Sequence, residues 1–85
     1  MGNSFSEIVR DAVRQIPRGE TRSYGQIAAI INRPRAARAV AMVMKGNYDL
    51  TVPCHRVIRA DGKLGGYNRG GEESKRKLLR QEGAL

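Results

Sequence analysis

The chain has 85 residues and a net charge of +8, from 16 Lys and Arg against 8 Asp and Glu. This length corresponds to one small domain, and an apolar content of 40% is too high for a disordered chain. No apolar run approaches the roughly 20 residues that cross a bilayer. A single cysteine excludes an internal disulfide, and with a single histidine it excludes a tetrahedral zinc site. We therefore expect one domain over residues 1–85 without a separate N-terminal domain, monomeric and cytoplasmic, with no metal, no cofactor and no membrane partner.

The excess of positive charge predicts an anionic partner. A small intracellular domain with a pI near 10.6 is typical of nucleic-acid binding, with an anionic membrane surface or a merely solvated basic surface as alternatives. Residues 21–48 contain five Lys and Arg and no acid. The charge is therefore concentrated in one part of the chain.

Three helices are predicted in the first half of the chain. Apolar residues at helical spacing indicate a helix over residues 5–16, with Ser4 and Glu7 at capping-box spacing and Pro17 ending it. Ser23 is a suitable N-cap for a helix over residues 23–31. Pro34 suits the first position of a third helix over residues 35–45. The last two helices have the outline of a helix-turn-helix.

The third predicted helix has two different faces. Successive side chains of a helix are rotated by about 100°, which places apolar residues on one face and basic residues on roughly the opposite face. The apolar face is expected to pack against the rest of the domain. The apolar face comprises Ala36, Val40, Val43 and Met44; the basic face comprises Arg35, Arg38, Met42 and Lys45. The alanines keep this helix slim, so its backbone can approach a partner's surface closely.

The second half is predicted to be irregular or β until a last helix. Residues 49–71 contain short apolar pieces, and Asp61-Gly62 favours a tight hairpin. Acids precede Lys and Arg over residues 72–82, as the helix dipole prefers, and Gly83 ends this helix. The predicted fold is mostly α: a small winged-helix-like helix-turn-helix domain, with a short β-hairpin or irregular active-site region and a C-terminal helix.

Cys54 and His55 are the only thiol and imidazole, and they are adjacent. A free cysteine is commonly buried and inert, which is one interpretation. The alternative is a nucleophile, because His55 and Arg56 favour the thiolate and histidine is the usual general base. Neighbours in an extended chain point to opposite faces, so a bridging water is the natural relay between them. A carboxylate should orient the imidazole, and spacing alone does not identify it.

The run Pro53-Cys54-His55-Arg56-Val57-Ile58 resembles the active-site motif of the O6-alkylguanine-DNA alkyltransferases, also called methylated-DNA–protein-cysteine methyltransferases. The resemblance extends over residues 5–83. It includes segments 16–19 and 23–28, Ala37-Arg38-Ala39-Val40, Gly46-Asn47, the glycine-rich residues 62–70 and the last helix.

The resemblance implies a role for each matching residue. Cys54 is the alkyl acceptor, and His55 is the base that acts through a water. Glu82 holds and polarises His55. Asn47 stabilises the loop between the third helix and Cys54. Arg38 enters the base stack while Tyr24 crowds the phosphate of the rotated nucleotide. The DNA-binding residues are expected to be Tyr24, Arg35, Arg38, Lys45 and Arg56. The substrate pocket is expected to comprise Tyr24, Met44, Val57, Gly65, Tyr67 and Asn68, with Asn68 standing where many relatives have Ser.

The function implied is repair of double-stranded DNA containing O6-alkylguanine. The protein would bind the minor groove, flip the base and transfer its alkyl group irreversibly to Cys54. Two alternatives stay open. One is an alkyltransferase-like sensor that binds O6-alkylguanine and recruits nucleotide excision repair proteins, although such proteins commonly replace the cysteine that this chain keeps. The other is a plain helix-turn-helix regulator, which leaves Cys54 and His55 without a purpose.

Overall fold

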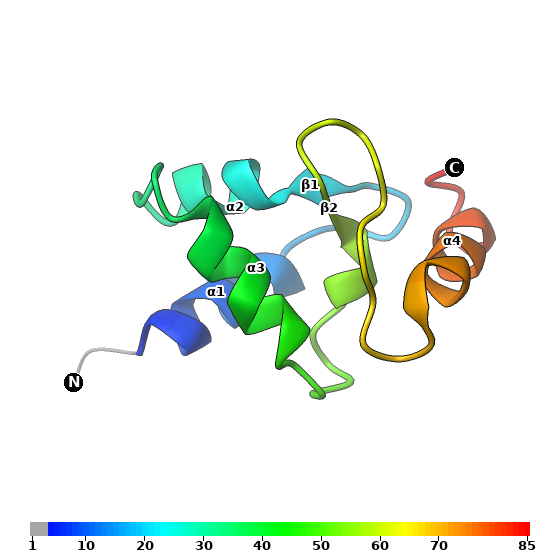
Figure 1. The fold of residues 1–85 in the computed structure, drawn as a ribbon, viewed down its shortest axis with the longest axis horizontal. Helices are drawn as coiled ribbons and strands as arrows, with labels where there is room; N and C mark the ends of the chain where they lie inside the picture. Colours follow the sequence, from blue (N-terminus) through cyan, green and yellow to red (C-terminus); the bar gives the residue numbers. More distant parts are fainter. Residues whose placement is uncertain (1–3) are drawn as a thin grey trace.

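The computed structural model describes residues 4–85. Over this range the chain is mostly α-helical, as predicted, with a small two-stranded sheet (Figure 1). The elements are α1 (Phe5–Arg14), β1 (Arg22–Ser23), α2 (Tyr24–Ile30), α3 (Ala37–Lys45), the 3-10 helix η1 (Cys54–Arg56), β2 (Val57–Ile58) and α4 (Gly71–Gln81). No helix in this described range has the length and apolar character to cross a membrane.

Local signals set the starts of the first two helices. The Ser4 side chain accepts a hydrogen bond from the Glu7 N–H, and Ser23 and Gln26 form a complete capping box. Helix α1 ends earlier than predicted, at Arg14, and the Ile16 N–H bonds to Val13 O in a tighter turn. Ile16 is nevertheless buried, because this turn folds its side chain back onto the helix's apolar face.

Helix α3 begins two residues later than predicted. Pro34 lies in the connecting turn and not at the first helical position, so that prediction is wrong. The Arg33 N–H bonds back to Ala28 O, and Asn32 adopts a left-handed φ of 61°. A turn follows in which the Ala36 N–H bonds to Arg33 O, so α3 begins only after it, with Ala36 as its N-cap.

The sheet is parallel and joins distant parts of the chain. β1 pairs with β2 in the register Arg22↔Val57 and Ser23↔Ile58. The predicted turn at Asp61-Gly62 forms, since Gly62 has a φ of +84° and its N–H bonds to Arg59 O. The Arg59 N–H also bonds to Lys63 O, which closes the tight hairpin turn that Asp61-Gly62 predicts. No second strand follows this turn within residues 4–85, and the sheet partner of β2 is β1.

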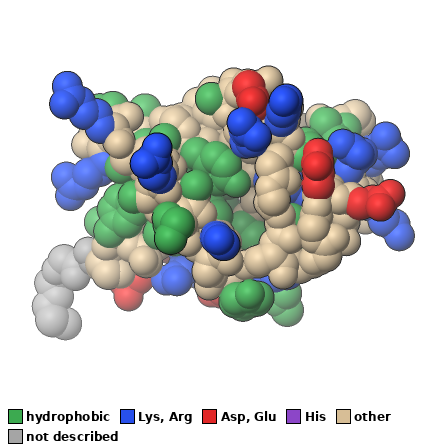
Figure 2. Space-filling model, viewed as in Figure 1, with side chains coloured by type: hydrophobic (Ala, Val, Ile, Leu, Met, Phe, Trp, Pro, Cys, Tyr) green, Lys and Arg blue, Asp and Glu red, His purple; other side chains and the backbone are tan. Residues whose placement is uncertain are grey.

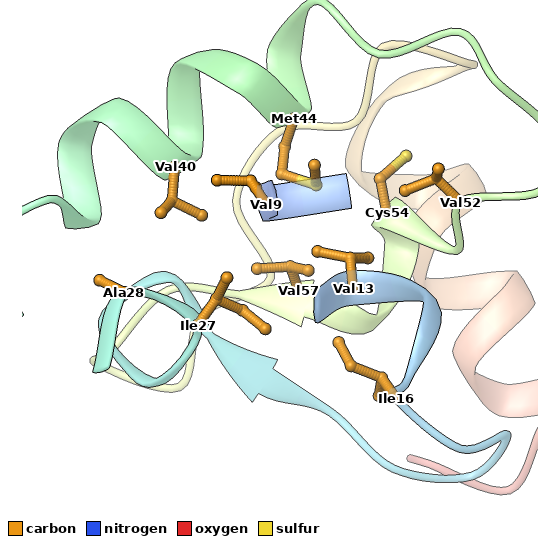
Figure 3. Packing of buried hydrophobic residues seen from close by; sticks show 10 residues of the cluster. All are labelled: Val9, Val13, Ile16, Ile27, Ala28, Val40, Met44, Val52, Cys54 and Val57. Carbon is orange, nitrogen blue, oxygen red and sulfur yellow. The ribbon is translucent and has the colours of Figure 1, made fainter. Parts of the chain in front are cut away.

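The core lies between α1, α2, α3 and the β2 segment (Figure 3). Its buried residues are Val9, Val13, Ile16, Ile27, Ala28, Val40, Met44, Val52, Cys54 and Val57. Figure 1 shows α4 on the opposite side of the η1–β2 segment from the other three helices. Cys54 therefore lies where the helix-turn-helix part meets the C-terminal part of the chain.

Candidate active site

Cys54 is the first residue of η1 and forms part of a cavity wall. Its exposed fraction is only 5%, and Figure 3 shows it beside Val52 at one end of the core cluster. The cavity has a volume of about 380 Å³. Its lining comprises Tyr24, Ala41, Met44, Lys45, Cys54, Gly66, Tyr67 and Asn68. A single thiol thus borders a hollow formed by α2, α3 and the glycine-rich residues 65–70.

His55 is held by a carboxylate from the far end of the chain. Its Nε2 lies 2.9 Å from Glu82 Oε2, at the C-cap of α4. Arg56 binds the same carboxylate through Nε at 2.9 Å and Nη2 at 2.7 Å, and its Nη1 donates to Ile16 O. The predicted pairing of His55 with Glu82 is therefore present, and Arg56 is a third member of the cluster.

The cluster determines the charge of Glu82 and the tautomer of His55. The hydrogen bond from Arg56 lowers the pKa of Glu82 to about 2, so this carboxylate is ionised at neutral pH. An ionised carboxylate only accepts hydrogen bonds, so Nε2 of His55 carries a proton. A neutral imidazole in this setting presents Nδ1 as its free acceptor.

Cys54 and His55 open to different hollows. No hydrogen bond joins the thiol to the imidazole among residues 4–85. His55 lines a separate groove of about 470 Å³, with Leu50, Leu78 and Arg69 among its other walls. Tyr67 borders both hollows, and its ring meets that of His55 edge-on with centroids 6.3 Å apart. The thiol and the imidazole are thus not hydrogen-bonded to each other, and the transfer of a proton between them through water stays a prediction.

Asn68 attaches the glycine-rich loop to the end of α3. Its Nδ2 donates to Lys45 O at 2.9 Å and to Asn47 O at 2.6 Å, with Met44 O at 3.4 Å. Asn47 is itself buried, and its Nδ2 donates to Asp49 O. The two asparagines thus connect α3, the segment leading to Cys54 and the cavity wall.

The other predicted pocket residues are divided between cavity and core. Tyr24 and Met44 line the cavity, and burial raises the pKa of Tyr24, with Cys54 nearby raising it further. Gly65 lies next to the cavity, close to the Tyr24 hydroxyl. Val57 is fully buried in the core and does not line the cavity, so its assignment to the pocket is wrong. Strand β2 turns this side chain into the core.

Helix α3 presents the predicted basic face. Arg38 and Lys45 are exposed on α3, and Arg35 is exposed in the turn just before it; we call these three residues the basic face of α3. None of them forms an ion pair within residues 4–85, while Val40 and Met44 on the other face of the helix are buried. Figure 2 shows Lys and Arg side chains over the α2–α3 region with no acid among them. Arg56 does not belong to this face. Its guanidinium binds Glu82 and Ile16 O, and its DNA contact stays a prediction.

Three residues near the site were not predicted from the sequence. Ala41 and Gly66 line the cavity, and Lys75 is buried beneath it with Nζ 3.4 Å from Gly66 O. Lys75 has a signal in the sequence, because it shares the helical spacing of the apolar face of α4 with Leu79. Nothing in the pattern around Ala41 distinguishes it from the other alanines of α3.

Comparison with known proteins gives one consistent family. Residues 4–84 match the family model described as "6-O-methylguanine DNA methyltransferase, DNA binding domain". The chain is 52% identical over 82 residues to the methylated-DNA–protein-cysteine methyltransferase of Mycobacterium tuberculosis, covering 95% of this chain and 49% of that protein. It is 49% identical over 82 residues to the bifunctional transcriptional activator/DNA repair enzyme Ada of Escherichia coli, covering 95% of this chain and 23% of Ada. The chain therefore spans about half or less of the length of these curated relatives.

Two solved structures resemble this fold closely. The Mycobacterium tuberculosis OGT in complex with DNA matches with a TM-score of 0.89 and 50% identity, over 99% of this chain and 52% of that one. The Schizosaccharomyces pombe protein Atl1, in complex with damaged DNA containing O6-carboxymethylguanine, matches with a TM-score of 0.83 and 36% identity. That match covers 93% of this chain and 75% of Atl1.

Proposed function

The chain belongs to the family of 6-O-methylguanine DNA methyltransferase DNA-binding domains, and from this premise we propose that it repairs DNA by transferring an alkyl group from O6 of guanine to Cys54. The transfer is irreversible, so each molecule reacts once, as a methylated-DNA–[protein]-cysteine S-methyltransferase. Its partner is double-stranded DNA containing O6-alkylguanine.

One observation carries this proposal: the thiol of Cys54 borders a cavity while an ionised carboxylate orients the adjacent imidazole. A cavity of about 380 Å³ falls in the size range of small-ligand sites. Cysteine reacts as its thiolate, and a general base is the usual means of removing the proton. The Glu82 carboxylate holds His55 in the tautomer whose Nδ1 can accept that proton through a water.

The basic face of α3 is suited to bringing DNA to this cavity. Arg35, Arg38 and Lys45 supply charge for phosphates, and the alanines of α3 allow its backbone to approach a groove. Met44 and Lys45 at the end of this helix also line the cavity. A base inside the stack is inaccessible to a protein thiol, so the target guanine must rotate out of the duplex. Arg38 then fills the vacated space, and Tyr24 crowds the rotated phosphate.

The chemical step is an in-line displacement. The Cys54 proton passes through a water to His55, and a sulfur–carbon bond forms as the bond from that carbon to O6 breaks. The electron pair of the broken bond remains on guanine, which takes up a proton from water at N1. His55 returns the proton of Cys54 to water, so that protons and charge balance. Cys54 becomes a thioether, and no residue around the cavity offers a route to reverse it.

A damage sensor that binds O6-alkylguanine without transfer is the second candidate function. The similarity to Atl1 over three quarters of that protein's length favours it. In this case Cys54 is a cavity-lining residue only, and nucleotide excision repair proteins are the partners.

Intact mass spectrometry distinguishes the two functions. The protein is mixed with a duplex oligonucleotide containing one O6-methylguanine. We expect a mass gain of one methylene unit (about 14 Da), located on Cys54, absent in Cys54→Ala and absent with an unmodified duplex. Selective binding of the modified duplex without a mass change would refute transfer and support the sensor.

A further inference from the structure

Lys75 occupies a position that a lysine rarely takes. It lies on the inward face of α4 with 1% of its surface exposed, and it is the largest fully buried side chain in the described part of the chain. The other Lys and Arg residues of this helix are exposed. Buried lysines are ordinarily paired with an acid, because the charged form is poorly solvated in the interior. No carboxylate lies within salt-bridge distance of Lys75 among residues 4–85.

Lys75 is connected to the wall of the Cys54 cavity. Its Nζ donates one hydrogen bond, of 3.4 Å, to the carbonyl of Gly66, which is part of the cavity wall. Burial lowers the pKa of Lys75 to about 8, while negative charge on Cys54, and to a smaller extent on Glu72, raises it. Tyr24 faces Cys54 from α2, and its raised pKa keeps this phenol neutral at physiological pH. Of the two acidic groups near Lys75, Cys54 therefore has the larger effect on the ammonium.

We propose that Lys75 is a positioning residue for the alkyl transfer described above: its ammonium anchors the glycine-rich wall through Gly66 and stabilises the Cys54 thiolate electrostatically. This inference rests on the proposed function for its biological purpose. The physical coupling between Lys75 and Cys54 can be measured without DNA.

Lys75 keeps its proton throughout the transfer. The proton released by Cys54 goes through water to His55, and the positive charge of Lys75 only increases the fraction of Cys54 present as thiolate. When the thioether forms, the negative charge leaves the sulfur with the departing guanine. Lys75 therefore stabilises the Cys54 thiolate only until the sulfur–carbon bond forms.

The test compares Lys75→Met, which keeps length without charge, with Lys75→Arg, which keeps charge, and with Lys77→Met as an exposed control on the same helix. Carboxamidomethylation of Cys54 by iodoacetamide is followed by mass spectrometry between pH 6 and pH 10. At pH 7 we expect Cys54 of Lys75→Met to react about five- to tenfold more slowly, because this variant lacks one positive charge near the thiolate. The difference in rate between Lys75→Met and the unmodified protein should shrink above pH 9, where Lys75 is neutral in the unmodified protein. Lys75→Arg should restore most of the rate, and Lys77→Met should equal the unmodified protein.

Equal rates for Lys75→Met and the unmodified protein, or a deficit that persists unchanged to pH 10, would overturn the proposal and leave Lys75 a structural residue. If Lys75→Met does not fold, the unmodified protein still gives an answer by NMR of ¹³C-labelled lysine. Capping Cys54 with methyl methanethiosulfonate should then lower the pKa of Lys75, and an unchanged value would overturn the coupling. A protein that passes these tests but gains no methyl group from the modified duplex refutes the proposed function alone.

Discussion

Glu82 connects three distant parts of the chain through one carboxylate. It accepts hydrogen bonds from His55 and Arg56, and Arg56 in turn binds Ile16 O at the end of the first helical segment. The side chain of Glu82 is 9% exposed, so these bonds are shielded from water. The group that orients the proposed base therefore also stabilises the packing of α4 on η1, and function and stability depend on the same charge.

Glu82 should make the protein sensitive to acid. Because its pKa falls from 4.5 to about 2 on folding, its contribution is fully present above pH 4.5 and is lost as the pH falls toward 2. The expected loss is on the order of 2–3 kcal/mol of unfolding free energy. Urea unfolding measured at intervals between pH 6 and pH 2 tests this, because Glu82→Gln should be less stable at pH 6 and should lose less stability on acidification.

Glu73→Gln is the matched control, because Glu73 is an exposed carboxylate on the same helix. It should keep the acid sensitivity of the unmodified protein. If Glu82→Gln followed the same pH profile as this control, the carboxylate would not be the acid-sensitive group.

At the scale of elements, the glycine-rich loop is the part of the site with the least regular structure. Its backbone passes between β2 and α4, with left-handed φ values at Gly65 and Gly70. Two side chains hold it: Asn68 bonds it to the end of α3, and Lys75 bonds it to α4. The cavity wall therefore keeps its place through side chains and not through a sheet.

Asn68→Ala should loosen this loop more than it unfolds the domain. Removing the amide leaves carbonyls of α3 and Asn47 without a donor, at a cost of about 1–3 kcal/mol. Amide hydrogen exchange of residues 65–70 should accelerate, while that of α1 and α2 changes little. Lys63→Ala, in an exposed part of the same loop, should leave exchange unchanged; equal exchange in both variants would show that Asn68 does not hold the loop.

At the scale of the whole molecule, the positive charge is unevenly distributed. Residues 21–48 carry no acid, and exposed Lys and Arg side chains lie over α2 and α3 (Figure 2). The acids of α4 and of the loop lie outside this region. This asymmetry favours one orientation on a polyanion, with the cavity mouth beside the contacting helix.

The salt dependence of duplex binding should therefore depend on which charges are removed. The triple variant Arg35→Gln, Arg38→Gln, Lys45→Gln should bind an unmodified duplex more weakly, and its slope of log K against log salt should be shallower by about 3. Fluorescence anisotropy at several salt concentrations measures both quantities.

The variant Lys63→Gln, Lys77→Gln, Arg80→Gln removes the same charge from exposed positions outside the α3 face. It should bind nearly as the unmodified protein does. A similar loss of slope in both variants would mean that binding depends on net charge and not on the α3 face.

Most of the secondary structure could be predicted because its signals are local. Ser4, Ser23, Gly46 and Gly83 cap or end helices through bonds to residues a few positions away, and the structure confirms each of them at a helix terminus. The start of α3 was predicted wrongly because a local turn competes with the helical signal of Pro34. The pattern around Asp61 could not reveal that β2 pairs with β1, because 33 residues separate the two strands in the chain.

Neighbouring residues alone predict the helical fold class, the basic face of α3 and the adjacent thiol and imidazole, because periodicity, capping and a short motif are local signals. The surroundings of these residues became known only from the packing of the whole domain. It turned Arg56 from a surface cation into a partner of Glu82, placed Val57 in the core, and buried Lys75 beneath the cavity. A side chain's burial and charge partners depend on elements far away in the chain, and packing brings those elements together.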